Sequence, residues 1–116
     1  MTRSNLYITL SNGKKINCVA ESSSAPEQGY IVEDLIIPLL KCNNTETEVK
    51  LLAEHCTMHE LRANAYYRYT IDLFTKEIRF FEETYNYTKG IFKKPVDITE
   101  RLTKYVSELQ NKSGNL

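Results

Sequence analysis

The stretch of residues 65–85 constrains the fold most, because apolar and polar side chains alternate through most of it. The stretch is rich in Tyr, Phe, Ile and Thr, which are enriched in β-strands. Residues 74–77, Phe-Thr-Lys-Glu, hold its expected turn. Since successive strand residues point to opposite faces, one side of this β-hairpin is predicted to lie on a core.

The register of this hairpin is predicted from both faces, because apolar and oppositely charged pairs across strands are stabilising. The apolar face is expected to place Leu73 opposite Ile78, Ile71 opposite Phe80, and Tyr69 beside Glu82. The charged face is expected to pair Arg68 with Glu83, Asp72 with Arg79, Tyr66 with Tyr85 and Thr70 with Phe81. We expect Leu73, Ile71, Ile78 and Phe80 to form the centre of the core with Leu102 and Leu109.

An earlier β-hairpin is predicted around Asn12-Gly13, which separates two strand-like runs, 6–10 and 15–20. A two-residue Asn-Gly loop would place apolar residues opposite polar ones. A three-residue loop, residues 11–13, instead pairs Ile8 with Ile16 and Leu6 with Cys18. We favour the three-residue loop, in which Gly13 is the left-handed residue of a bulge.

Three helices are expected where apolar residues recur at helical spacing. The first begins near Ile31 and is kinked or ended by Pro38. The second follows a candidate capping box at residues 45–48 and runs to about Cys56. The third is capped by Asp97 with Glu100 at its N3 position. Its apolar stripe consists of Ile98, Leu102, Tyr105, Val106 and Leu109.

The predicted fold is α+β, with the order ββααββα. The two hairpins are expected to form one antiparallel sheet with the helices packed on one face, in two layers. The chain has 116 residues, which is close to the commonest size of a domain. We expect one domain over residues 1–112 and a frayed C-terminal tail over residues 113–116.

Charge and cysteine content narrow the class and location of the protein. The 15 basic and 15 acidic residues balance, so there is no overall attraction to phosphate. Cys18, Cys42 and Cys56 are odd in number and widely spaced, which favours reduced thiols. The N-terminus has no apolar signal segment, and no apolar run approaches the ~20 residues of a membrane-spanning helix. We therefore expect a cytoplasmic protein without membrane contact.

The charged face of the second hairpin is the predicted functional surface. It carries aromatic and basic residues, namely Tyr66, Arg68, Arg79, Phe81 and Tyr85. Tyr, Phe and Arg are enriched at protein interfaces. We predict a non-enzymatic protein-interaction module that forms a homodimer or binds another protein through this face. The alternative is a nucleic-acid-associated accessory protein that uses Arg68 and Arg79 with the rings, although nearby acidic residues would cancel both arginines.

The segment 54–60 carries the residues best suited to catalysis. If it is helical, His55 and His59 lie at i,i+4, the spacing at which two imidazoles reach one Zn²⁺. A further ligand would have to come from Glu60, Cys42 or Cys18. A thiol enzyme would instead pair Cys56 or Cys42 with a histidine. A metal- or thiol-dependent enzyme around His55, Cys56 and His59 is therefore the third hypothesis. We predict no catalytic residues, metal, cofactor or small-molecule ligand.

Overall fold

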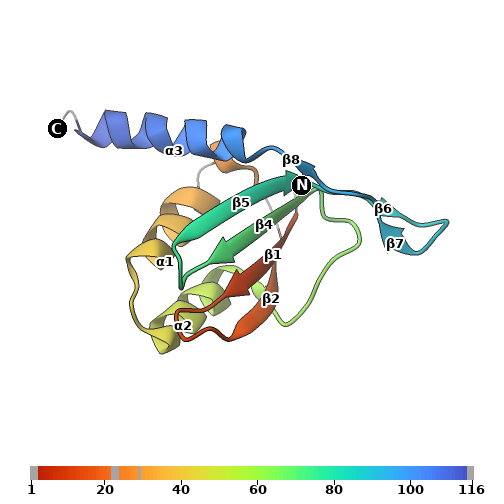
Figure 1. Ribbon diagram of the computed structural model, residues 1–116, viewed down its shortest axis with the longest axis horizontal. Helices are drawn as coiled ribbons and strands as arrows, with labels where there is room; N and C mark the ends of the chain where they lie inside the picture. The colour runs from red at the N-terminus through yellow and green to blue at the C-terminus, as the bar shows by residue number, and fades with distance from the viewer. Residues whose placement is uncertain (1–2, 22–23, 29, 115–116) are drawn as a thin grey trace.

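The two predicted hairpins lie side by side at the centre of one sheet in the computed structural model, which describes residues 3–21, 24–28 and 30–114 (Figure 1). The first hairpin consists of β1 (Ser4–Thr9) and β2 (Lys15–Ala20), and the second of β4 (Tyr67–Asp72) and β5 (Glu77–Glu82). Two short strands, β3 (Thr57–Met58) and β8 (Val96–Asp97), extend the edges, so that the order is β3-β2-β1-β4-β5-β8. A separate small hairpin is formed by β6 (Tyr85–Asn86) and β7 (Ile91–Phe92).

Helical segments connect the two hairpins and follow the second one. They are the 3₁₀ turn η1 (Pro26–Gln28), the π-helix η2 (Ile31–Ile36), α1 (Ile37–Lys41), α2 (Thr45–His55) and α3 (Thr99–Gly114). The α+β class is therefore confirmed. The predicted order ββααββα lacks the four short strands and the 3₁₀ and π segments that the described residues contain.

The sheet is mixed, so the prediction of an antiparallel sheet is wrong. Strands β1 and β4 run parallel, with Leu6 beside Tyr69 and Ile8 beside Ile71. The helical segments between β2 and β4 return the chain to the end of the sheet where β1 begins, and such a crossover produces a parallel pair. Alternation identifies strands and faces but says nothing about direction, which is why the sequence did not reveal this pair.

The register of the first hairpin is confirmed. Ile8 lies opposite Ile16 and Leu6 opposite Cys18. The Gly13 amide donates to the Leu10 carbonyl at 2.8 Å, and Gly13 has a φ of 89°. A three-residue loop with a left-handed glycine therefore closes this hairpin, as its apolar face requires.

The predicted register of the second hairpin is wrong by two residues. Ile71 lies opposite Ile78, Tyr69 opposite Phe80 and Arg68 opposite Phe81. Because the side-chain period of a strand is two, this shift leaves the residues of β4 and β5 on their predicted faces.

The turn of the second hairpin explains this register. The Asp72 carboxylate accepts hydrogen bonds from the Phe74 and Thr75 amides at 2.9 and 3.1 Å. Lys76 adopts a φ of 64°, and residues 73–76 form the loop. The Leu73 backbone amide donates to the Thr9 carbonyl at 2.8 Å, and the Leu73 side chain is buried. Leu73 therefore extends the parallel pairing of β4 with β1 and cannot pair with Ile78.

The helix ends differ from their predicted caps. Asn44, rather than Thr45, caps α2 by accepting a hydrogen bond from the Thr47 amide at 3.1 Å. The Glu48 carboxylate is buried and accepts hydrogen bonds from the amide and hydroxyl of Ser11, both at 3.0 Å. The predicted capping glutamate therefore joins α2 to the loop of the first hairpin.

Proline and aspartate mark the starts of the other two helices. Pro38 lies in the first turn of α1, and the preceding Ile37 amide donates to Val32, five residues back. The helix therefore does not end at Pro38. The π-helical segment η2 runs directly into α1, which contains this proline. The Asp97 side chain accepts a hydrogen bond at 2.9 Å from the amide of Thr99, the first residue of α3, and so lies one position before the usual capping residue.

The core lies between one face of the sheet and the helical segments. Four of the six residues predicted at its centre are buried, namely Ile71, Leu73, Phe80 and Leu102. Ile78 and Leu109 are half-buried at its margin. No helix in the described part of the chain is long and apolar enough to cross a membrane.

Phe80→Ala is expected to lower the free energy of unfolding by roughly 3–5 kcal/mol, because it removes a buried ring from this core. The Phe80 ring lies 4.6 Å from that of Tyr69 and 5.0 Å from that of Tyr67, between ring centroids. The matched control, Phe81→Ala, changes the neighbouring residue on the other face. Chemical denaturation measures both. A loss well under 1 kcal/mol for Phe80→Ala would mean that the two faces are inverted.

Candidate functional site

The face of the sheet opposite the core, the open face, carries three of the five predicted interface residues: Arg68, Arg79 and Phe81. Tyr7 of β1 joins them, because β1 lies beside β4. The Arg68 guanidinium carbon is 4.3 Å from the centroid of the Tyr7 ring and 5.4 Å from that of Phe81. An arginine thus lies between two aromatic rings that come from different strands.

Carboxylates neutralise both arginines of the open face. Arg68 Nη1 lies 3.4 Å from Glu83 Oε2, and Arg79 Nη1 lies 3.5 Å from Asp97 Oδ2. The predicted pair of Arg68 with Glu83 is therefore confirmed as a contact. Arg79 pairs with Asp97 of β8 rather than with Asp72, because the register is shifted and β8 adds an edge strand.

Glu83 holds Arg68 in place. Its side chain is buried, and its second oxygen, Oε1, has no hydrogen-bond partner among the described residues. A buried carboxylate without its cation is strongly unfavourable, so Arg68 is fixed beside it. Burial, and then the negative charge of Glu83, raise the pKa of the Tyr7 hydroxyl, while the charge of Arg68 lowers it.

The loop of residues 59–66 covers one end of the open face. The Asn5 side-chain nitrogen Nδ2 donates a hydrogen bond to the Arg62 backbone carbonyl at 3.0 Å. Its oxygen Oδ1 accepts a hydrogen bond from the Arg62 backbone amide at 2.8 Å. Asn5 and Val19 are consequently buried although they face away from the core. The Arg62 side chain pairs with Glu21 at 3.0 Å, and the loop is thus anchored to β2. The exposed part of the open face is centred on Tyr7, Arg68 and Phe81.

Tyr66 and Tyr85, the other two predicted interface residues, do not lie opposite each other. Tyr85 belongs to β6 and pairs with Phe92 of β7. Tyr66 is 55% exposed and lines a shallow hollow with Tyr85, Tyr87 and neighbouring residues of the 63–66 loop. The structure therefore divides the predicted surface into the open face and the base of the β6–β7 hairpin.

The two histidines do not share a helical face. Helix α2 ends at His55, and the chain is extended from Cys56 into β3. His59 has a φ of 61°, and the His55 ring bonds through Nδ1 to the Leu51 carbonyl at 3.1 Å. Across the described ranges, no group of three or more His, Cys, Asp or Glu side chains is placed to hold a metal ion. The i,i+4 premise of the metal hypothesis is therefore wrong.

The Cys18 thiol is poorly suited to nucleophilic attack. Cys18 is fully buried, and a hydrogen bond with the Cys56 thiol, followed by burial, raises the pKa of the Cys18 thiol. A catalytic cysteine needs a depressed pKa and access to its substrate. Cys56, at the end of α2, is half-buried and lies beside Cys18. Among the described residues, no hydrogen bond joins Cys56 to a histidine.

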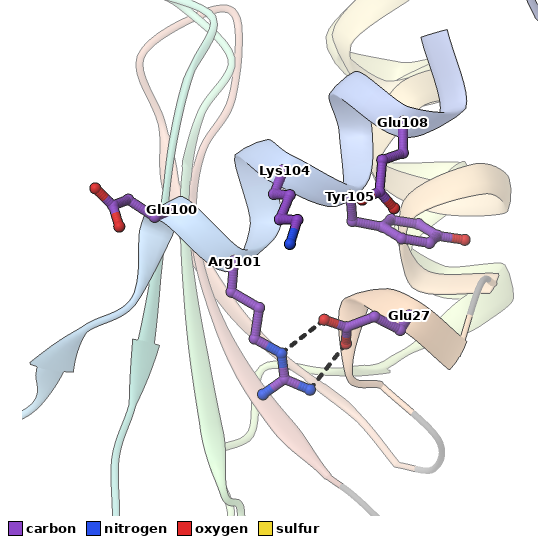
Figure 2. A pocket seen from close by; sticks show the side chains of 6 residues that line it. All are labelled: Glu27, Glu100, Arg101, Lys104, Tyr105 and Glu108. Carbon is purple, nitrogen blue, oxygen red and sulfur yellow. Dashed lines mark hydrogen bonds and ion pairs between the residues drawn. The ribbon is translucent and has the colours of Figure 1, made fainter. Parts of the chain in front are cut away.

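A polar hollow lies between η1 and α3 (Figure 2). Figure 2 shows Arg101 facing Glu27, whereas Glu100 points away. The Arg101 guanidinium donates to both Glu27 oxygens at 2.7 and 2.8 Å and to the Tyr67 hydroxyl at 3.0 Å. This cluster fastens α3 to the 24–28 segment and to β4. Arg101 and Glu27 neutralise each other, as in a structural contact.

No family model matches the sequence, and neither curated proteins nor solved structures include a significant match to the chain.

Glu27→Gln is expected to destabilise the protein by roughly 0.5–1 kcal/mol at pH 7, because it removes a partly exposed bidentate ion pair. The hydrogen bond from Arg101 is the main cause that lowers the pKa of the Glu27 carboxyl in the folded state. Its contribution is therefore present above the unfolded pKa of about 4.3 and is lost as the pH falls through the folded pKa.

Thermal or chemical denaturation at pH 7 and pH 3 measures this effect. The difference between the wild type and Glu27→Gln should shrink at pH 3. Glu100→Gln, which alters an exposed carboxylate of the same hollow, is the control and should change stability little at either pH. Equal effects of the two variants at pH 7 would contradict the assigned role of Glu27.

Proposed function

We propose that this protein is a non-enzymatic protein-interaction module whose contact surface is the open face around Tyr7, Arg68 and Phe81. The observation that carries the proposal is the Arg68 guanidinium between two rings, on the face of the sheet opposite the helices that the structure describes. A few residues contribute most of the binding energy at a protein interface, and Tyr and Arg are enriched among them.

This surface is already ordered before a partner arrives. The buried Glu83 carboxylate fixes Arg68 through their ion pair, and strand pairing fixes the Tyr7 and Phe81 backbones. Binding therefore costs little side-chain entropy, which is the main benefit of a preorganised surface. Tyr7 and Phe81 remain partly exposed, so a partner could bury the rest of both rings.

A second copy of the chain is the occupant that the charges favour. A twofold contact places the same patch on both sides, so the patch must carry both signs of charge. The open face does so through the Arg68–Glu83 and Arg79–Asp97 pairs. Its four central strands span about 20 Å by 19 Å, or about 400 Å², against about 800 Å² per partner in a standard interface. The open face alone therefore supports a weak homodimer.

The same pairing weakens the nucleic-acid alternative for the open face, since neither Arg68 nor Arg79 is free to neutralise a phosphate. The third hypothesis, an enzyme around His55 and His59, is weakened because the two histidines do not lie on one helix. A different protein partner is the other occupant consistent with the surface. The cytoplasmic location predicted from the sequence remains a prediction.

Light scattering coupled to size exclusion at about 100 µM protein tests self-association, which should raise the apparent mass above that of the monomer. Phe81→Ser and Tyr7→Ser should each return the mass to the monomer value, since each removes a ring from the stack. Phe74→Ser is the control, because Phe74 is 71% exposed in the hairpin turn and lies outside the open face. A wild type that is monomeric throughout would exclude the second copy as the occupant.

A further inference from the structure

The β6–β7 hairpin with its flanking residues, 84–95, forms an arm that projects from the body of the protein (Figure 1). It lies at the end of the molecule opposite the C-terminus of α3. Its two strands form their own sheet and do not join the six-stranded one. A lone two-stranded hairpin gains little stability from its own contacts, and this arm adds no strand to the main sheet.

The arm has a defined turn. The Asn86 side-chain oxygen accepts hydrogen bonds from the Thr88 and Lys89 amides at 3.0 and 3.1 Å. Gly90 adopts a φ of 70°, and its amide donates to the Asn86 carbonyl at 2.8 Å. The Lys93 amide closes the base by donating to the Thr84 carbonyl at 2.8 Å. The turn thus presents Lys89 at a fixed position on the tip.

Three aromatic rings stiffen the arm. The Tyr85 ring centroid lies 5.1 Å from that of Tyr87 and 5.0 Å from that of Phe92, both in edge-to-face geometry. Tyr85 and Phe92 are half-buried, but Tyr87 remains 71% exposed. Most of the Tyr87 ring is consequently available to a ligand, while its contact with Tyr85 holds it in place.

The arm is locally basic in a chain that is neutral overall. It contains Lys89, Lys93 and Lys94 and no acidic residue. Removing these 3 from the 15 basic residues leaves 12 against 15 acidic ones, so the rest of the chain carries a formal charge of −3. All three lysines are exposed, and within the described ranges none is ion-paired with a carboxylate. The positive charge is therefore concentrated on the projecting element.

We propose that the arm binds the phosphate backbone of a nucleic acid, with its three lysines on phosphates and Tyr87 stacked on a base. Exposed lysines beside an exposed ring are the combination by which single strands are bound without sequence preference. Bases of a single strand expose their faces, whereas those of a duplex are stacked on each other. We therefore infer a preference for single strands.

The distribution of side chains on the arm disfavours an anionic membrane as the ligand. A membrane-inserting hairpin would carry its apolar residues at the tip. Here the tip residues 87–90 are Tyr, Thr, Lys and Gly, while Ile91 and Phe92 lie behind them on β7. This proposal is independent of the open face, since it uses different residues and a different ligand.

Fluorescence anisotropy of a labelled 20-nucleotide oligothymidylate, in 50 and 200 mM NaCl, tests the arm. Three phosphate contacts give a salt exponent of about −2, so affinity should fall roughly 20-fold between these concentrations. The triple variant Lys89→Gln, Lys93→Gln, Lys94→Gln should lose most binding and this salt dependence. The control triple Lys14→Gln, Lys15→Gln, Lys50→Gln changes net charge equally at exposed sites outside the arm and should bind like the wild type.

Tyr87→Ser tests the stacking. It should weaken single-strand binding at least fivefold and affect a 20-base-pair duplex much less. Phe74→Ser, which removes an equally exposed ring, is the control and should have no effect. Equal losses in the two lysine triples would overturn the arm as the binding element, and so would undetectable binding of the wild type at 50 mM NaCl. Binding to vesicles of phosphatidylcholine with phosphatidylserine, without binding to the oligonucleotide, would assign the arm to membranes instead.

Discussion

The parallel pairing of β1 with β4 is the contact on which the rest of the structure depends. It joins two antiparallel hairpins, each of which would be marginal alone, into one sheet with a common core face. Leu6 beside Tyr69 and Ile8 beside Ile71 place large apolar side chains from both hairpins on that face. The helical segments η1, η2, α1 and α2 lie between β1 and β4 in the sequence, so this pair is a long-range contact.

The same pairing creates the open face. It brings Tyr7 from the N-terminal hairpin to within 4.3 Å of the Arg68 guanidinium, measured to the ring centroid. Loop 59–66, which leads into β4, then crosses back and buries Asn5. After β5 the chain leaves the sheet, forms the basic arm and returns through β8 into α3. The strand order therefore places two different surfaces on the molecule. The open face is neutral and aromatic, and the arm is basic.

Alternation in the sequence was enough to predict which residues face the core, since Ile71, Leu73 and Phe80 are buried as expected. The strand register and the strand partners could not be predicted from alternation alone. Asp72 and Lys76 set a four-residue turn, and the same pattern of an Asp or Asn followed four residues later by a left-handed residue recurs at Asn86 and Gly90. The spacing of Asn86 and Gly90 can be read from the sequence and would have indicated the turn of the arm. The left-handed conformation of Lys76 cannot be read in this way, because lysine does not favour a positive φ. Tyr7 could not be found, because its contact with Arg68 depends on a long-range parallel pair.

Nuclear Overhauser contacts between β1 and β4 test the central claim most directly. In the isotope-labelled protein, the account predicts contacts from the Tyr7 ring protons to the Arg68 side chain, together with contacts between the Leu6 methyl groups and the Tyr69 ring. Contacts of β1 only with β2, and of β4 only with β5, would contradict the account, since the two hairpins would then not form one sheet.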